Sequence, residues 1–187
     1  MSTGLKITFE EYSRLVERGL LDELRDRRIE LIHGELREMP APGPSHAELV
    51  DRLTEWSLDQ APRNEVRVRT QNPIGIPLLQ SAPLPDIAWV RRGDYSQRHP
   101  LPQETLLIIE VSDSSLAFDT DEKAALYAEA GIREYWVVDV QDESLIVHRD
   151  PSPQGYANIS THQLNDAIHP GACPAIFLSP AALFRAR

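Results

Sequence analysis

A run of large apolar residues, Leu106–Val111, stands near the middle of the chain and has the sequence LLIIEV. Its length and its branched aliphatic side chains are typical of a strand that is buried on both faces. Glu110 interrupts the run, and a charge inside a buried strand is costly unless it is paired or bound to another group. The pattern therefore predicts a central strand with a functional carboxylate, and we expect that carboxylate to bind a metal ion.

Three segments carry the signals of helices. Each is opened by a Ser, Thr or Asp, with a Glu three residues later, as in a capping box. A glycine or a proline marks the end of each segment. The predicted helices are Phe9–Arg18 with Thr8 and Glu11 as caps, His46–Gln60 with Ser45 and Glu48, and Asp119–Ala130 with Asp119 and Glu122.

Shorter apolar and alternating segments predict the remaining strands of a sheet. Arg28–Met39 is typical of a hairpin that turns at His33-Gly34, with Glu30 and Glu35 on one face. The order of elements predicts an α/β or α+β fold, with a mixed central β-sheet flanked by helices and a hairpin towards each terminus. The other predicted strands are Glu65–Thr70, Asp86–Val90, Glu134–Val140, Leu145–Arg149 and Tyr156–Thr161, with Ile74–Leu78 as an extension that bends at Gly75.

The composition adds limits on function. The 187 residues suit one domain spanning 1–187, and no stretch has the apolar length of a membrane span or of a signal peptide. The single cysteine, Cys173, excludes an internal disulfide and a cysteine-rich zinc site. We therefore expect a cytoplasmic protein. The net charge of −10 argues against non-specific coating of nucleic acid, but it suits carboxylates that surround a divalent cation.

Three charged residues are the candidates for chemistry. Asp86 opens one predicted strand, Glu110 lies within the central strand, and Lys123 lies in the first turn of the helix that follows. If the two strands are neighbours, both carboxylates can bind one Mg²⁺, which would polarise a phosphoryl oxygen. The Lys123 ammonium would then orient the attacking water or stabilise the charge that develops on the phosphate.

This arrangement resembles the PD-(D/E)XK nuclease superfamily, whose acids are matched by Asp86 after Pro85 and by Glu110. The chain is more closely similar to the Uma-two family of bacterial proteins, usually described as restriction endonucleases, from about Thr8 to Phe184. The matching segments are IELIHGEL, GPSH, PDIAWV, LIIEVSDSS and DEKAALYAEAGIREYWVVD, which begin at residues 29, 43, 85, 107 and 121.

The resemblance implies a restriction-endonuclease-like fold and a metal-dependent endonuclease that cuts DNA with Mg²⁺ or Mn²⁺. It assigns metal binding to Asp86 and Glu110. Position 112 holds Ser112 where the superfamily pattern has Lys, so the resemblance transfers that role to Lys123. Glu35 matches a family acid near the site, and the resemblance implies a catalytic contribution from Glu35 through a water. A homodimer is expected as well, because many nucleases of this superfamily pair to cut two strands.

Four further residues are expected near the site without a direct part in the chemistry. They are Glu30 and His46, which match residues of the family, and Ser112 and Tyr127, which lie at the end of the central strand and one helical turn beyond the lysine.

Non-catalytic interpretations stay open for the same residues. Asp86 can cap a strand, and Glu110 and Lys123 can form a structural ion pair. The chain would then be a catalytically silent nuclease-fold module that binds DNA or another protein. Hydrolysis of RNA or of another phosphodiester also agrees with the sequence. Two interpretations, a DNA groove and a solvated face, stay open for Arg67, Arg69, Arg91 and Arg92.

Overall fold

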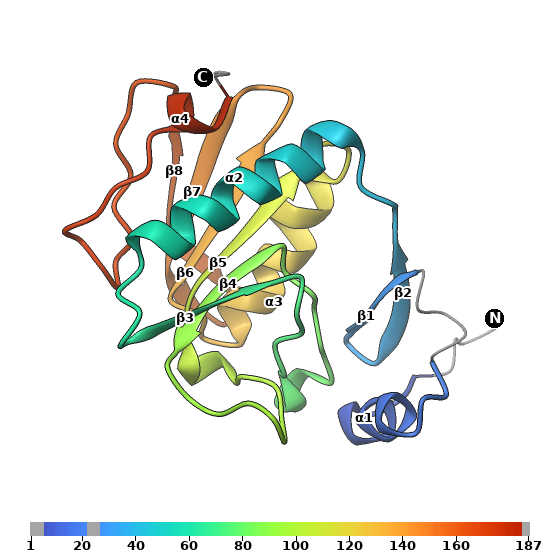
Figure 1. The fold of residues 1–187 in the computed structure, drawn as a ribbon. Coiled ribbons are helices and arrows are strands. Elements are labelled where there is room, and N and C mark those ends of the chain that lie inside the picture. Colours follow the sequence, from blue (N-terminus) through green and yellow to red (C-terminus); the bar gives the residue numbers. More distant parts are fainter. Residues whose placement is uncertain (1–5, 22–26, 185–187) are drawn as a thin grey trace.

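The computed structural model describes residues 6–21 and 27–184, and its main feature is a mixed sheet of six strands (Figure 1). The strands lie in the order β3-β4-β5-β6-β7-β8. β5 and β6 are parallel, and all other neighbours are antiparallel. The predicted mixed sheet is therefore confirmed, with the Glu110 strand paired on both sides. The strands are β3 (Val66–Thr70), β4 (Ile87–Arg91), β5 (Thr105–Ser112), β6 (Glu134–Asp139), β7 (Ser144–Ser152) and β8 (Gly155–His162).

A strand–helix–strand unit carries the candidate residues. The helical segment between β5 and β6 contains a π-helical turn, η4 (Phe118–Lys123), followed by α3 (Ala124–Glu129). Tyr127 of α3 packs with Ile108 and Tyr135 of the two strands, and all three side chains are buried. This apolar contact fixes the helical segment against the strand that bears the candidate carboxylate.

The opposite face of the sheet is covered by α2 (Pro44–Gln60) (Figure 1). Its apolar stripe includes Leu53, which is fully buried, and burial of one such side chain contributes about 2 kcal/mol. Trp56 of α2 stacks on Trp89 of β4 with ring centroids 5.3 Å apart. A short C-terminal helix, α4 (Pro180–Phe184), packs beside α2, so the apolar C-terminal segment joins the core.

The N-terminal hairpin forms a separate two-stranded sheet of β1 (Arg28–Ile32) and β2 (Glu35–Met39). Its turn residues His33 and Gly34 both have positive φ, 49° and 82°, as a two-residue hairpin turn requires. The register is the predicted one. The hairpin follows α1 (Phe9–Glu17), which begins with the predicted capping box.

The predicted N-cap of α2 is wrong. Pro44 is the first helical residue, because its fixed φ suits that position, and Gly43 precedes it without a side-chain hydrogen bond. Ser45 therefore lies inside the first turn. Glu48 pairs with Arg52 one turn further on, at 2.8 Å, rather than completing a capping box.

The predicted start of the helix before β6 is also wrong. The segment is already helical at Leu116, three residues before the predicted start. Asp119 does not cap it, because its carboxylate accepts hydrogen bonds from serine hydroxyls instead. Glu122 likewise pairs with Arg37 of β2 at 2.5 Å.

The segment Ile74–Leu78 does not extend the sheet. Ile76 forms only an isolated bridge to Ser81, and Pro77, which lacks an N–H, opens a 3₁₀ turn, η2 (Pro77–Leu79). A second 3₁₀ turn, η3 (Pro102–Glu104), leads into β5. None of the helices within 6–21 and 27–184 has both the length and the apolarity needed to cross a membrane.

Candidate active site

Asp86 and Glu110 lie side by side where β4 begins and β5 ends. The register pairs Ile87 with Ile109, so the adjacent position pairs Asp86 with Glu110. The Asp86 N–H donates to Glu110 Oε2 at 3.2 Å, and both residues are 2% exposed. The sequence prediction that these two acids come together on neighbouring strands agrees with this geometry.

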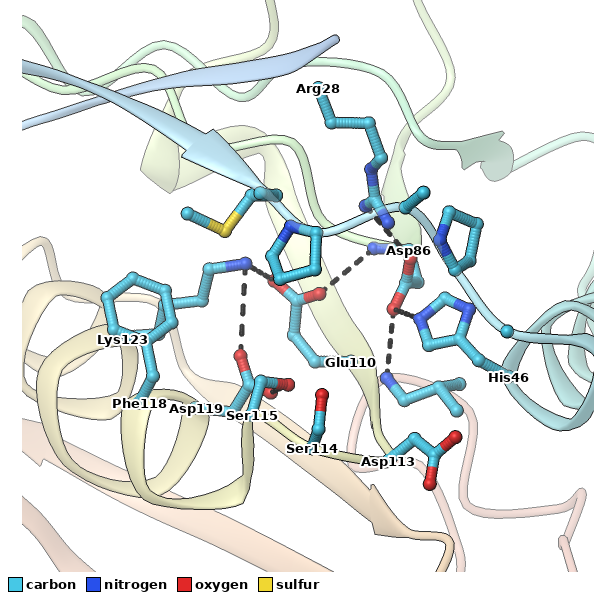
Figure 2. Close-up of a pocket in the computed structure, with 16 residues that line it drawn as sticks. Arg28, His46, Asp86, Glu110, Asp113, Ser114, Ser115, Phe118, Asp119 and Lys123 are labelled. Atoms are coloured by element: carbon cyan, nitrogen blue, oxygen red, sulfur yellow. Dashed lines mark hydrogen bonds and ion pairs between the residues drawn. The ribbon is translucent and has the colours of Figure 1, made fainter.

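Lys123 reaches the same place from the π-helical turn (Figure 2). Its ammonium lies 2.8 Å from Glu110 Oε1 and 3.2 Å from Glu30 Oε1. The residue is 3% exposed. Single π-helical turns are frequent at functional sites, and here the turn ends at Lys123, whose ammonium contacts Glu110. The helix therefore supplies the ammonium that the strand lacks at position 112.

Asp119 has a larger role than the cap that the sequence predicts. Its Oδ2 accepts hydrogen bonds from the Ser112 and Ser115 hydroxyls, and its backbone oxygen accepts one from the Tyr135 hydroxyl at 3.0 Å. Its Oδ1 lies 3.9 Å from the Lys123 ammonium. The hydrogen bonds of Asp119 with Ser112 and Ser115, which we call the clasp, join the end of β5 to the helical turn that carries the lysine. The signal in the sequence is an acid four residues before the lysine, preceded by two serines.

The Asp86 carboxylate accepts hydrogen bonds on both oxygens. Arg28 and Gln71 donate to Oδ1 at 3.1 and 3.3 Å, while the Val111 N–H donates to Oδ2 at 3.0 Å and His46 Nε2 lies 3.1 Å from it. Burial alone would raise the pKa of Asp86. The hydrogen bond and charge of His46, the Val111 N–H and the Arg28 charge outweigh burial and lower the pKa to about 2. Asp86 is therefore an anion throughout the neutral range.

Glu110 responds in the opposite direction. Burial raises the pKa of Glu110 to about 8; Lys123 opposes the rise, and Asp86, Asp119 and Glu30 add to it. Burial would lower the pKa of Lys123, but Glu110, Glu30 and Asp119 together raise it above its ordinary value. The site thus holds more negative than positive charge, and the lysine stays protonated.

Tyr127 completes the surroundings of Glu110. Its hydroxyl donates to Glu110 Oε1 at 3.0 Å. Burial and then the nearby Glu110 raise the pKa of Tyr127 well above its ordinary value, so the hydroxyl keeps its proton. The tyrosine is a hydrogen-bond donor to the carboxylate, as well as a core residue.

The two hairpin acids differ in position. Glu30 is fully buried, and its Oε1 accepts the Leu84 N–H at 2.9 Å in addition to the lysine contact. Within the described ranges, Glu30 Oε2 is buried without a hydrogen-bond partner. Glu35 lies beside the turn, where it pairs with Arg37 at 3.1 Å and Lys6 at 3.6 Å, and it does not line the cavity at the site. The structure brings Glu30 to the lysine and does not bring Glu35 there.

An open cavity of about 90 Å³ gives access to this group (Figure 2). One wall is the linker Met39–Gly43 between the hairpin and α2, and another is the loop Asp113–Ser115 with Phe118. Asp86 and Glu110 contribute to its lining, as do Arg28, His46, Asp119 and Lys123. The arrangement can expose two carboxylates and two cations to a small charged group.

Comparisons with known proteins place this geometry in a family. The model of the Uma2 family, described as "Putative restriction endonuclease", matches residues 9–180. No curated protein matches the chain. Among solved structures, the chain is similar to the crystal structure of a "putative nuclease belonging to DUF820" from Anabaena variabilis, with a TM-score of 0.75 and 16% identity. That match covers 95% of this chain and 97% of the other, which shows a shared fold. The chain belongs to the Uma2 family of restriction-endonuclease-like proteins.

Proposed function

We propose that this protein is a metal-dependent endonuclease that hydrolyses phosphodiester bonds in DNA. The observation that carries the proposal is the buried group of Asp86, Glu110 and Lys123 at the wall of an open cavity. Two carboxylates from neighbouring strands suit one hard divalent cation, and an ammonium 2.8 Å from one of them suits the charge that develops on a phosphate.

The residues present fit Mg²⁺ or Mn²⁺. Four buried carboxylates, on Glu30, Asp86, Glu110 and Asp119, face one arginine and one lysine, and an oxygen of Glu30 lacks a partner among the described residues. In that same part of the chain, no three His, Cys, Asp or Glu side chains form a ready-made ligand set. Mg²⁺ commonly binds through one or two carboxylates and keeps several waters, so the pair of Asp86 and Glu110 is sufficient for it. We assign the metal to Asp86 and Glu110. When bound, such a cation polarises the phosphoryl group and makes a water more acidic.

Lys123 acts as a donor and not as a base. Its raised pKa keeps the ammonium charged, so it orients the attacking water and stabilises negative charge on the phosphate. Tyr127 and Lys123 both donate to Glu110 Oε1 and hold that carboxylate in one orientation. Asp119, through its serine hydrogen bonds, positions the turn from which the lysine projects.

Arg28 and His46 orient the other carboxylate. Both contact Asp86 at 3.1 Å and both line the cavity. The Arg28 side chain is 22% exposed, so its guanidinium is also within reach of a phosphate in the cavity. We assign it a part in binding the substrate phosphate.

Plasmid nicking tests the proposal. The wild type is incubated with supercoiled DNA and Mg²⁺ or Mn²⁺, beside the near-isosteric variants Asp86→Asn and Glu110→Gln. Asp113→Asn is the matched control, because Asp113 lines the same cavity and bonds only Gln141 among the described residues. Cutting by the wild type and by the control, but not by the two site variants, is expected. Equal cutting by all four proteins, or cutting that survives a chelator, would refute the assignment.

A silent module is the second candidate, and the buried Glu110–Lys123 pair favours it, because such a pair can persist without chemistry. Calorimetry with Mn²⁺ separates the two. The endonuclease binds the ion with a stoichiometric signal that Glu110→Gln abolishes, whereas the silent module gives no signal in either protein.

The nucleic acid that is cut and the oligomeric state are also proposals, and each has its own test. A labelled RNA run beside DNA distinguishes a ribonuclease from a deoxyribonuclease. We propose a homodimer for cutting both strands of a duplex, and light scattering of the purified protein measures that state.

A further inference from the structure

A cluster of arginines surrounds Tyr95, on the face of the sheet that also carries Asp86 and Glu110. The guanidinium carbons of Arg67 and Arg69, both on β3, lie 5.9 and 5.8 Å from the centroid of the Tyr95 ring. Arg98 lies 5.6 Å from the same centroid, and both oxygens of Glu104 bind it, at 2.6 and 2.7 Å. The charge of Arg98 is therefore neutralised by Glu104, which also holds the Arg98 side chain beside the ring.

The charges of Arg67 and Arg69 are not neutralised in this way. Within the described ranges, neither has a carboxylate oxygen within 4.0 Å or donates a hydrogen bond, and Arg69 Nε is buried without an acceptor. Asp94, in the same loop as Tyr95, accepts the Ser96 N–H at 2.9 Å. This hydrogen bond and then the charge of Arg67 lower the pKa of Asp94, so this exposed carboxylate is a more distant counterion of Arg67. Burial and the neighbouring Arg67 lower the pKa of Arg69, as expected for a positive charge without a counterion. An anion from outside would satisfy both guanidinium groups.

β3 connects these arginines to the candidate site. It is an edge strand of the sheet (Figure 1), and its register with β4 places Gln71 beside Asp86. Gln71 bonds Asp86 twice, from its N–H to the backbone oxygen at 3.0 Å and from Nε2 to Oδ1 at 3.3 Å. Arg67 and Arg69 are two residues apart on β3, so they lie on the same face about 7 Å apart, and the register pairs Arg69 with Ala88, two residues after Asp86. Arg67 and Arg69 thus form a positively charged track on this face, and Arg69 is the member nearer to Asp86.

We propose that Arg67 and Arg69 bind successive backbone phosphates of the nucleic acid and guide it into the cavity. The inference rests on the proposed endonuclease function, and it assigns the surface along which the substrate lies. Guanidinium groups recognise phosphates with paired hydrogen bonds, and such contacts set position without reading sequence. A protein with a net charge of −10 repels a polyanion elsewhere, so a local positive track is the surface that a duplex can approach. Tyr95 holds the two guanidinium groups in place through its ring.

Salt dependence of DNA binding tests this surface. Anisotropy of a fluorescein-labelled random-sequence duplex is measured with chelator, so that no DNA is cut, at several salt concentrations. The variants are Arg67→Gln, Arg69→Gln and the double substitution. Arg18→Gln is the control, because Arg18 is an exposed arginine at the end of α1. Each lost phosphate contact reduces the magnitude of the negative slope of log K against log salt by about 0.9, and the double variant reduces it by about 1.8.

Several outcomes overturn the inference. They are an unchanged slope in a folded double variant, an equal loss in the control, and a wild type that does not bind the duplex. A second measurement needs no variant: phenylglyoxal modification of the wild type, read by mass spectrometry, must show that the duplex protects Arg67 and Arg69 but not Arg18. Capture of polyglutamate in place of DNA would assign the surface to an acidic protein and also overturn it.

Failure of the surface and failure of the endonuclease are distinguishable. Arginine-dependent binding without cutting in Mg²⁺ would refute the endonuclease and keep the surface. Cutting by the wild type with unaltered binding by the double variant would keep the endonuclease and refute the surface.

Discussion

Lys123→Met removes a buried ammonium and leaves its carboxylate partners in place. Met has a similar length, so the packing is nearly kept, while the contacts of 2.8 and 3.2 Å to Glu110 and Glu30 are lost. Both partners are almost completely buried, at 2% and 0% exposure. Breaking such a pair from one side costs about 3–5 kcal/mol, because each carboxylate left behind must either stay ionised without its counterion or take up a proton on folding. We expect a loss of that size in the free energy of unfolding.

The loss should depend on pH in a defined direction. The pKa of Glu110 is already raised to about 8 with the lysine present, and it rises further without the lysine. A carboxyl whose folded-state pKa exceeds its unfolded value holds its proton more tightly when folded, so stability is present at low pH and is lost as the pH rises through the folded pKa. Lys123→Met should therefore be least stable in alkaline buffer and partly recover near pH 5.

Urea unfolding at several pH values, followed by tryptophan fluorescence, measures both effects. Lys6→Met is the matched control, because Lys6 pairs with Glu35 on the surface at 62% and 48% exposure, and such pairs contribute little. The double variant Lys123→Met/Glu110→Gln removes both charges and should regain much of the loss. A cost below about 1 kcal/mol at every pH, for Lys123→Met alone, contradicts the charge reasoning.

Three further predictions concern the surroundings of the site. Asp86 has a pKa of about 2 against an ordinary 3.8, so its ionised form stabilises the fold by about 2 kcal/mol above pH 5. This contribution is lost as the pH falls, roughly half of it by pH 3. In urea unfolding at several pH values, Asp86→Asn should therefore lack this part of the loss of stability in acid. Asp119→Ala frees the serines that fix the helical turn, so misplacement of Lys123 should lower kcat by up to about 100-fold while DNA affinity is kept, as single-turnover cutting and anisotropy would show. Gly34→Ala should lower stability by about 1–2 kcal/mol, measured as a lower Tm, because φ is +82° and the new Cβ would meet Ile7 O at 3.0 Å.

The elements and the pairing of the two acids were accessible from the sequence. Periodicity and the His33-Gly34 turn set the hairpin register, and a buried strand with one interrupting acid identified Glu110. The adjacency of Asp86 to Glu110 was conditional on the two strands being neighbours, and the observed register of β4 and β5 supplies it. The hairpin and the Glu110 strand depend on local patterns, which a single sequence carries.

Other features depend on contacts between distant segments. Glu30 and Glu35 share a hairpin face, and only the contact with Leu84 decides which of them is buried beside Lys123. The π-helical turn was not predictable either, because the helical segment Phe118–Glu129 is too short for its apolar pattern to reveal the shift that one extra residue in a turn causes. Asp119 was therefore interpreted as a cap, although it holds the end of β5.

The serine at the end of β5 limits where a second lysine can be placed. Ser112 is 1% exposed and donates to Asp119, so a lysine side chain introduced there would have no room beside the clasp. A lysine at position 112 in place of Lys123 thus requires Ser112→Lys, removal of Lys123 and release of Asp119 together. Ser112→Lys alone places two ammonium groups among the same carboxylates, and removal of Lys123 alone leaves none. Release of Asp119 alone keeps Lys123 but frees the turn that carries it.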